Sequence, residues 1–443
     1  MSNLVIVESP SKTKTIGKYL GSNYKVVSSK GHIRDLATTG KYGLGIDVDN
    51  NFEPNYTTIK GKANVIKELK SDAKKSDMVY LATDPDREGE AISWHIKDAL
   101  GIKDDKYERV VFNEITKDAV VNAFKRPRKI DYNLVKSQET RRMLDRIIGF
   151  RLSKLMQSKT GGKSAGRVQS VALKLIVDRE EEIEKFIPEE YWNISAILLD
   201  EKSKKNFVAK FYGKDGKKLA IHSKEEVDNI LKDIENGKYI VTEVKKGEKK
   251  RNPAPPFTTS TMQQEASRKL GFTLKKTMSI AQGLYEGVKV GEKGTVGLIT
   301  YMRTDSTRIS EEARAAAKNQ IIKTYGEQYY ENRYYKTKQN AQDAHEGIRP
   351  TYVDLVPEEI KEYLTNDQYK LYRLIYHRFL ASQMATAIYD VVSANIDVNK
   401  YNFRASGQTL KFKGFMTLYV ETEDNKQEEA LNCEATRLRA LIF

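Results

Sequence analysis

The sequence has one cysteine, Cys433, in 443 residues. A single cysteine excludes an internal disulfide framework and a cysteine-rich zinc site, and it fits a reducing, cytoplasmic compartment. No apolar run reaches the roughly 18 residues that a membrane span needs. The N-terminus also has no basic segment followed by a long apolar run. We therefore expect neither a signal peptide nor a membrane partner.

Positive charge is in excess. Lysine and arginine number 76 against 61 acidic residues, which gives a formal net charge of +15. Such an excess favours a polyanionic partner, nucleic acid before a membrane surface. An ordinary basic enzyme would also fit the charge. The length indicates about two to four domains.

The N-terminal part alternates strand and helix signals. Short apolar runs at 4–7, 78–82 and 109–112 predict buried strands, and helices are predicted from Pro10 onward and over 88–100. Strands separated by helices are typical of a largely parallel sheet.

Later segments change character twice. Residues 131–186 predict helices with apolar stripes, and 192–199 and 239–244 predict strands. After prolines at 253–256, helices are predicted over 261–270, 275–285, 311–323 and 367–387. From Tyr389 onward, alternation predicts a strand that returns to the earlier sheet.

Residues 299–306 place Tyr301, Arg303 and Asp305 at every second position. In an extended segment these side chains would share one face. A phenol has a pKa near ~10, and a neighbouring cation favours the phenolate, so Tyr301 is a candidate nucleophile. A polar turn after a buried strand explains the same residues without any chemistry.

Four carboxylates are predicted at strand ends. Glu8 ends the first strand, and Asp84, Asp86 and Glu88 follow the second. Because ligand sites of parallel sheets lie beyond the carboxyl ends of strands, these groups should converge. Oxygen ligands without cysteine or histidine favour Mg²⁺. Acidic residues at a helix N-terminus are also favoured by the helix dipole alone.

A family resemblance covers nearly all of residues 1–420. Glu8 with the Asp84-x-Asp86-x-Glu88 motif resembles a Toprim domain. The wider match is to bacterial type IA DNA topoisomerase I (omega protein), and it lies in segments 4–14, 29–36, 83–92, 141–149, 164–170, 258–264 and 298–306.

The resemblance implies a multidomain α/β and α+β fold that forms an incomplete torus. It implies a Toprim domain, a helical DNA-binding base domain, a β-rich arch, and a helical domain that carries the tyrosine. Their expected ranges are, in that order, 1–35 with 60–130, 36–59 with 131–188, 189–256 with 386–430, and 257–385.

The resemblance also implies a reaction that needs no ATP, and the sequence has no Gly-x₄-Gly-Lys-Ser/Thr phosphate loop. Tyr301 would cleave one DNA strand through a 5′-phosphotyrosyl intermediate, which conserves the phosphodiester energy. Arg303 would stabilise the phosphate. Glu8 would be the general acid, with a raised pKa, and Lys12 would hold the phosphate or assist that proton transfer. Strand passage and Mg²⁺-dependent religation would then relax negative supercoils.

The same resemblance assigns the remaining site residues. Glu8, Asp84, Asp86 and Glu88 would form the metal site. Contacts to single-stranded DNA would come from His32, Arg141, Arg142, Asp145, Ser164, Ala165, Gly166, Arg167, Val168, Gln169, Gln282, Glu286 and His345. The expected protein is a bacterial, nucleoid-associated monomer.

The match fades after about residue 420, where family members continue with more of the arch and base domains. We therefore expect this chain to bind and cleave single-stranded DNA but to relax supercoils poorly. Two alternatives differ in what they require. A Toprim-type nuclease or primase-like enzyme would need the carboxylates but not Tyr301, and a non-catalytic single-stranded-DNA-binding protein would need only the basic groove.

Overall fold

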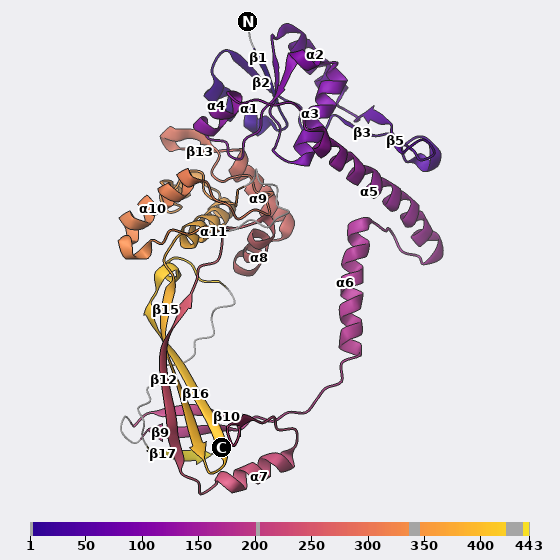
Figure 1. Cartoon of the computed structure of the whole chain (residues 1–443). Coiled ribbons are helices and arrows are strands. Elements are labelled where there is room, and N and C mark those ends of the chain that lie inside the picture. The colour runs from indigo at the N-terminus through magenta and orange to yellow at the C-terminus, as the bar shows by residue number, and fades with distance from the viewer. Residues whose placement is uncertain (1–2, 201–203, 336–345, 422–436, 443) are drawn as a thin grey trace. The chain divides into compact units, whose positions relative to one another are not determined.

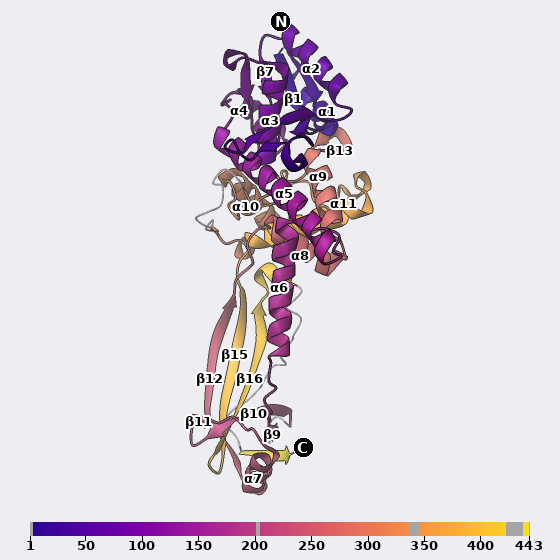
Figure 2. The same cartoon turned by 90° about the vertical axis from the view of Figure 1, so that its right-hand side faces the viewer.

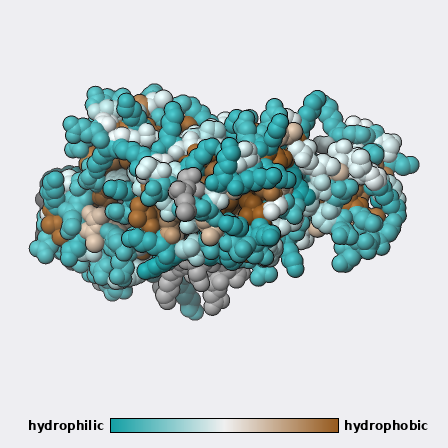
Figure 3. Space-filling view, turned by 90° about the horizontal axis from the view of Figure 1, so that it is seen from above, coloured by the Kyte–Doolittle hydropathy of each residue, from teal (hydrophilic) through white to brown (hydrophobic). Residues whose placement is uncertain are grey.

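The computed structural model describes residues 3–200, 204–335, 346–421 and 437–442. The chain forms two compact units. The first comprises Met1–Ile183, Pro256–Ala316 and Tyr334–Phe379, and the second comprises Glu184–Pro255, Ala317–Arg333 and Leu380–Phe443. Within the described residues, no helix has the length and apolar character needed to cross a membrane. The surface in Figure 3 is mostly hydrophilic, with small hydrophobic areas between polar ones.

A four-stranded parallel sheet begins the first unit. Its strand order is β2 (Tyr24–Ser28), β1 (Asn3–Val7), β7 (Val79–Leu81) and β8 (Tyr107–Arg109). Helices α1 (Pro10–Leu20) and α4 (Lys117–Phe124) lie on one side of the sheet, and α2 (Ala63–Lys75) and α3 (Arg87–Leu100) on the other (Figure 1).

These elements confirm the predicted parallel sheet. The third strand lies earlier than the predicted 109–112, because its neighbour β7 ends at Leu81, which pairs with Arg109. Fully buried Leu4, Ile6 and Leu81 contribute to the core between the sheet and its helices. Burial of this kind stabilises by roughly 1.5–3 kcal/mol per large side chain.

Two small antiparallel ladders interrupt the sheet between β2 and α2. They pair β3 (Arg34–Leu36) with β6 (Tyr56–Thr58) and β4 (Ile46–Asp47) with β5 (Glu53–Pro54), beside a short 3₁₀ turn at Lys41–Gly43. The long helix α5 (Tyr132–Lys159) packs on α3. A loop then leads to α6 (Arg167–Glu184).

The apolar stripes expected over 131–186 are present but exposed. Leu155 on α5 and Leu175 and Ile176 on α6 are among the exposed large hydrophobic side chains. The apolar periodicity therefore predicted both helices correctly, but it did not predict that these apolar side chains are exposed.

A helical region surrounds the predicted tyrosine segment. Thr258 and Thr261 form a capping box at the start of α8 (Thr259–Leu270), and α9 (Leu274–Glu286) follows. A hairpin of β13 (Val288–Val290) and β14 (Gly294–Val296) comes next, with a 3₁₀ turn at Gly291–Lys293 between its strands. The remaining helices are α10 (Glu311–Tyr325) and α11 (Asn366–Ser382), with 3₁₀ turns at Glu327–Tyr329 and Lys361–Tyr363 between them. Helix α11 ends before the predicted residue 387 because a strand begins at Ala387.

The second unit is built on a seven-stranded sheet. Its order is β11 (Lys217–Lys218), β10 (Asn206–Lys214), β16 (Tyr401–Phe412), β15 (Ala387–Val398), β12 (Tyr239–Arg251), β17 (Arg437–Ile442) and β9 (Ser195–Asp200). Strands β12, β15 and β16 run side by side (Figures 1 and 2). Helix α7 (Lys224–Ile234) buries Val227, Ile230 and Ile234 against the sheet.

The predicted return of the chain at Tyr389 to the earlier sheet is confirmed by the pairing of β15 with β12. The prediction for β12 stopped at Val244, although the strand continues to Arg251. Residues 245–251 are almost all charged and largely exposed, so no apolar alternation marks their extended backbone.

Candidate active site

Tyr301 lies buried against the parallel-sheet domain, with 3% of its surface exposed. Its backbone N–H donates to the carbonyl of Asn113 at 2.7 Å. Its hydroxyl donates to Oδ2 of Asp86 at 2.7 Å. The ring packs edge-on against Tyr285, with 5.2 Å between centroids. The candidate nucleophile is therefore held next to the predicted carboxylate cluster, 215 residues away in sequence.

Arg303 reaches the same carboxylate as Tyr301. Its Nη1 lies 3.4 Å from Oδ2 of Asp86, and its side chain is 53% exposed. Asp305 is exposed, and the segment after Tyr301 is irregular rather than a strand. Tyr301 and Arg303 thus meet at Asp86, with the guanidinium open to an incoming anion, although the predicted extended segment with a shared face is not formed.

Lys12 bridges two of the predicted carboxylates. Its ammonium is fully buried and forms ion pairs with both Glu8 and Asp84. It also lies 5.1 Å from the centroid of the Tyr285 ring. Helix α1 positions Lys12 because Ser9 caps the helix and Pro10 starts it, which places Lys12 one turn beyond Glu8.

The protons of this group are divided unequally. Burial favours a raised pKa at Glu8, but Lys12 and hydrogen bonds from Asp84 and Lys12 outweigh it, so the pKa of Glu8 is lowered. Burial and the nearby Glu8 raise the pKa of Asp84 well above its usual range, against the opposing effect of Lys12. The raised pKa that was predicted for Glu8 is therefore not found there, and the raised pKa belongs to Asp84.

Tyr301 is protonated in this arrangement. Burial raises its pKa, and the negative charges of Asp84 and Asp86 raise it further. Arg303 acts in the opposite direction with a smaller effect. The neighbouring cation therefore favours the phenolate as expected, but burial and two acids outweigh this one arginine.

Arg109 holds the loop that carries the carboxylates, and sequence reasoning overlooked it. Its fully buried guanidinium donates to the carbonyls of Thr83 at 2.9 Å and Asp84 at 2.8 Å, and to Glu90 at 3.1 Å. The available signal was an arginine at the start of an otherwise apolar run. A charge at such a position requires buried partners.

Replacing Arg109 by Met should destabilise the sheet domain by about 3–5 kcal/mol, because Glu90, itself 1% exposed, loses a buried partner. Arg128→Met is the matched control, since Arg128 also pairs with Glu90 but is 37% exposed. Urea unfolding followed by Trp94 fluorescence, in a Trp192→Phe background, measures both. Equal small losses for the two variants would contradict this role of Arg109.

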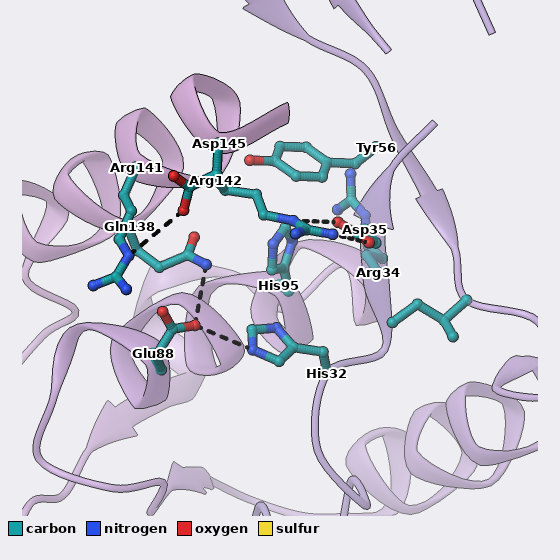
Figure 4. Close-up of a pocket in the computed structure, with 11 residues that line it drawn as sticks. His32, Arg34, Asp35, Tyr56, Glu88, His95, Gln138, Arg141, Arg142 and Asp145 are labelled. Atoms are coloured by element: carbon teal, nitrogen blue, oxygen red, sulfur yellow. Dashed lines mark hydrogen bonds and ion pairs between the residues drawn. The ribbon is translucent and has the colours of Figure 1, made fainter. Parts of the chain in front are cut away.

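Glu88 lines a cavity of about 450 Å³, which is drawn in Figure 4. Its Oε2 accepts from Gln138 at 3.1 Å and lies 3.4 Å from Nε2 of His32. Three predicted DNA contacts, Arg141, Arg142 and Asp145, line the same cavity.

Other groups complete that cavity. Arg142 pairs with Asp35 at 2.6 Å, and Asp145 pairs with Arg167 at 2.8 Å. Gln138, Tyr56 and His95 line the cavity without having been predicted. Gln138 and His95 lie close in sequence to the predicted Arg141 and Glu88, whereas Tyr56 carried no such signal.

The remaining predicted contacts are spread more widely. Gln282 donates to Glu286 at 2.8 Å, and Glu286 also accepts from Ser9 at 2.9 Å. Ser164, Ala165 and Gly166 precede α6, and Arg167, Val168 and Gln169 form its first turn, as predicted. His345 lies outside the described residues.

The predicted metal ligands line one cavity of about 630 Å³. Its lining includes Glu8, Asp84, Asp86 and Glu88, together with Arg303 and Gln282. Within the described part of the chain, no three acidic, histidine or cysteine side chains are close enough to enclose an ion. Mg²⁺ commonly uses one or two carboxylates and keeps several waters, so this donor set fits it in type.

Comparison with known proteins agrees with the geometry. A family model described as Toprim domain matches residues 3–115, and one described as DNA topoisomerase matches residues 129–438. The structure of full-length topoisomerase I from Thermotoga maritima is similar at 39% sequence identity and a TM-score of 0.80, covering 99% of this chain and 72% of that one. Toprim domains generally bind Mg²⁺. The chain therefore belongs to the bacterial type IA DNA topoisomerases, DNA-binding isomerases with a Toprim domain.

Proposed function

We propose that Tyr301 is the nucleophile of this topoisomerase and that it attacks a phosphodiester of single-stranded DNA. The phenolic oxygen forms a bond to phosphorus while the bond from phosphorus to the 3′-oxygen breaks. The hydrogen bond of 2.7 Å from Tyr301 to Asp86 carries this proposal, because Asp86 is placed to accept the phenolic proton as the new bond forms. Arg303 offsets the charge that grows on the phosphate.

The leaving 3′-oxygen needs one proton, and we assign its delivery to the group of Glu8, Lys12 and Asp84. Glu8 remains the direct donor, as the family resemblance implies. Because Lys12 forms ion pairs with both Glu8 and Asp84, a proton that Glu8 gives to the 3′-oxygen can be replaced from Lys12 or Asp84. Religation reverses the same transfers.

Mg²⁺ is assigned to the cavity lined by Glu8, Asp84, Asp86 and Glu88. A bound ion would supply positive charge that aligns the broken ends for religation. The protein supplies the carboxylates, and Arg109 fixes the backbone of Asp84 through a hydrogen bond of 2.8 Å.

Chelating Mg²⁺ should leave cleavage measurable and slow religation by at least about tenfold, because cleavage uses Tyr301, Arg303 and the Lys12 group. The measurement compares the covalent complex before and after EDTA, with Mg²⁺ re-addition as the control. Unchanged religation in EDTA would contradict the assigned role of the ion.

We propose that the DNA strand follows the cavity drawn in Figure 4, which is supported by Arg141, Arg142 and His32 in its lining. Phosphate contacts make such binding sensitive to salt, because bound counterions are released. The other predicted DNA contacts, including His345, are retained in this proposal. We further propose a monomer that acts on single-stranded segments of negatively supercoiled DNA, with the four domains divided as the resemblance implies.

One experiment separates this function from its alternatives. The protein is mixed with labelled single-stranded DNA and Mg²⁺ and then denatured rapidly. Label attached to protein supports the proposal. Cleaved DNA without attached protein would instead indicate a nuclease, and binding without cleavage would indicate a binding protein.

A further inference from the structure

A buried ion pair joins the segment that precedes Thr116 to the segment that follows Glu346. Arg349 is 6% exposed, and its guanidinium donates to Glu114 at 2.9 Å and to Glu346 at 2.7 Å. Glu346 lies three residues before Arg349, whereas Glu114 belongs to the segment that matches the Toprim domain. The bond to Glu114 therefore joins two parts of the chain, and the bond to Glu346 is local.

This pair is connected to Tyr301 through the backbone. The N–H of Thr300 donates to the carbonyl of Arg349 at 3.0 Å, and the N–H of Arg349 donates to Oγ1 of Thr300 at 3.0 Å. In the segment that matches the Toprim domain, the residue directly before Glu114 is Asn113, whose carbonyl accepts from the N–H of Tyr301 at 2.7 Å. Tyr301 is therefore one member of a closed ring of five links. These are the hydrogen bond to Asn113, the peptide bond to Glu114, the ion pair with Arg349, the hydrogen bonding to Thr300 and the peptide bond back to Tyr301.

The pair can separate without leaving an isolated buried charge. Arg349 would keep Glu346 as its partner, and Glu114 would keep the hydroxyl of Thr116, which donates to it at 3.0 Å. A cavity of about 980 Å³ is lined by Glu114, Glu346 and Arg349 and offers room for water. These features limit the desolvation cost that normally makes breaking a buried pair expensive.

We propose that Glu114 and Arg349 form a releasable latch, with Arg349 as a positioning residue that holds Tyr301 against the Toprim domain. The inference rests on the proposed role of Tyr301 as nucleophile. Strand passage requires Tyr301 to move away from the Toprim carboxylates, so the latch must open after cleavage and close before religation. Weakening it favours the open, cleaved state.

The primary test is Glu114→Gln, which removes one charge and keeps the shape. A charged hydrogen bond of this kind leads us to expect an increase of about tenfold in the ratio of covalent complex to rejoined DNA. In DNA-free protein, the amide of Tyr301 should exchange with deuterium several-fold faster, because its bond to Asn113 opens more often. Glu346→Gln is the matched control, since it touches the same guanidinium but does not cross between the parts.

The outcomes separate the latch from the proposed function. If wild type forms no covalent complex that depends on Tyr301, both the proposed function and the latch are overturned. If the complex forms but Glu114→Gln matches wild type or Glu346→Gln in both readouts, the latch alone is overturned. Arg349→Lys, which keeps the charge and loses the forked geometry, serves as second variant if Glu114→Gln does not fold, with the same expected and contradicting results.

Discussion

Replacing Tyr301 by Phe should abolish covalent attachment of DNA, with cleavage falling by at least about 10⁴-fold. The substitution removes only the hydroxyl, which donates to Asp86 at 2.7 Å, and leaves the ring packed against Tyr285. Binding of single-stranded DNA should change little, because Arg141 and Arg142 lie in a different cavity. Labelled oligonucleotide cleavage and a binding titration measure the two effects separately.

Tyr285→Phe is the matched control. Tyr285 is fully buried beside Tyr301, and its hydroxyl donates to the carbonyl of Phe112 at 3.4 Å. Losing this long hydrogen bond should leave DNA cleavage within about tenfold of wild type. Cleavage that survives in Tyr301→Phe, or that is lost equally in both variants, would contradict the role of Tyr301 as the nucleophile.

Lys12→Met should reduce cleavage by about 10²- to 10³-fold, the effect expected for losing a preorganised charge next to a reacting oxygen. The ammonium is fully buried between Glu8 and Asp84. Without it, the two carboxyls face each other in a buried site, and the pKa of Glu8 should rise because Lys12 lowers it. Single-turnover cleavage of an oligonucleotide measures the loss.

Lys14→Met is the control for general charge effects, because Lys14 lies on the same helix but is exposed. It should retain cleavage within about twofold of wild type, since exposed charges contribute little. Equal losses in both variants would mean that Lys12 acts only through net charge.

Much of the site could be predicted because of one topological rule. Strands β1 and β7 are parallel neighbours, with Ile6 paired to Leu81, so Glu8 and Asp84 follow at the same sheet edge. The tyrosine segment could be recognised through its family resemblance. Helix α1 was predictable from Pro10 in its first turn, and α3 from its apolar spacing.

Other features depend on contacts that sequence spacing does not encode. Lys12 was expected near the phosphate, but it lies buried between two acids, where it helps to lower the pKa of Glu8 while burial and Glu8 raise the pKa of Asp84. Arg109 and Arg349 act through long-range backbone and carboxylate partners, which only the folded chain brings together. The exposed apolar side chains on α6 show the same limit, since apolar periodicity predicts a helix but not whether its apolar face is buried.

The central claim is that Tyr301 forms the covalent bond to DNA. The most direct measurement digests the trapped complex with a protease and nuclease and identifies the modified peptide by mass spectrometry. We predict a nucleotide attached through its 5′-phosphate to Tyr301, with a free 3′-hydroxyl on the other DNA fragment. Attachment to any other residue, or through a 3′-phosphate, would contradict the account.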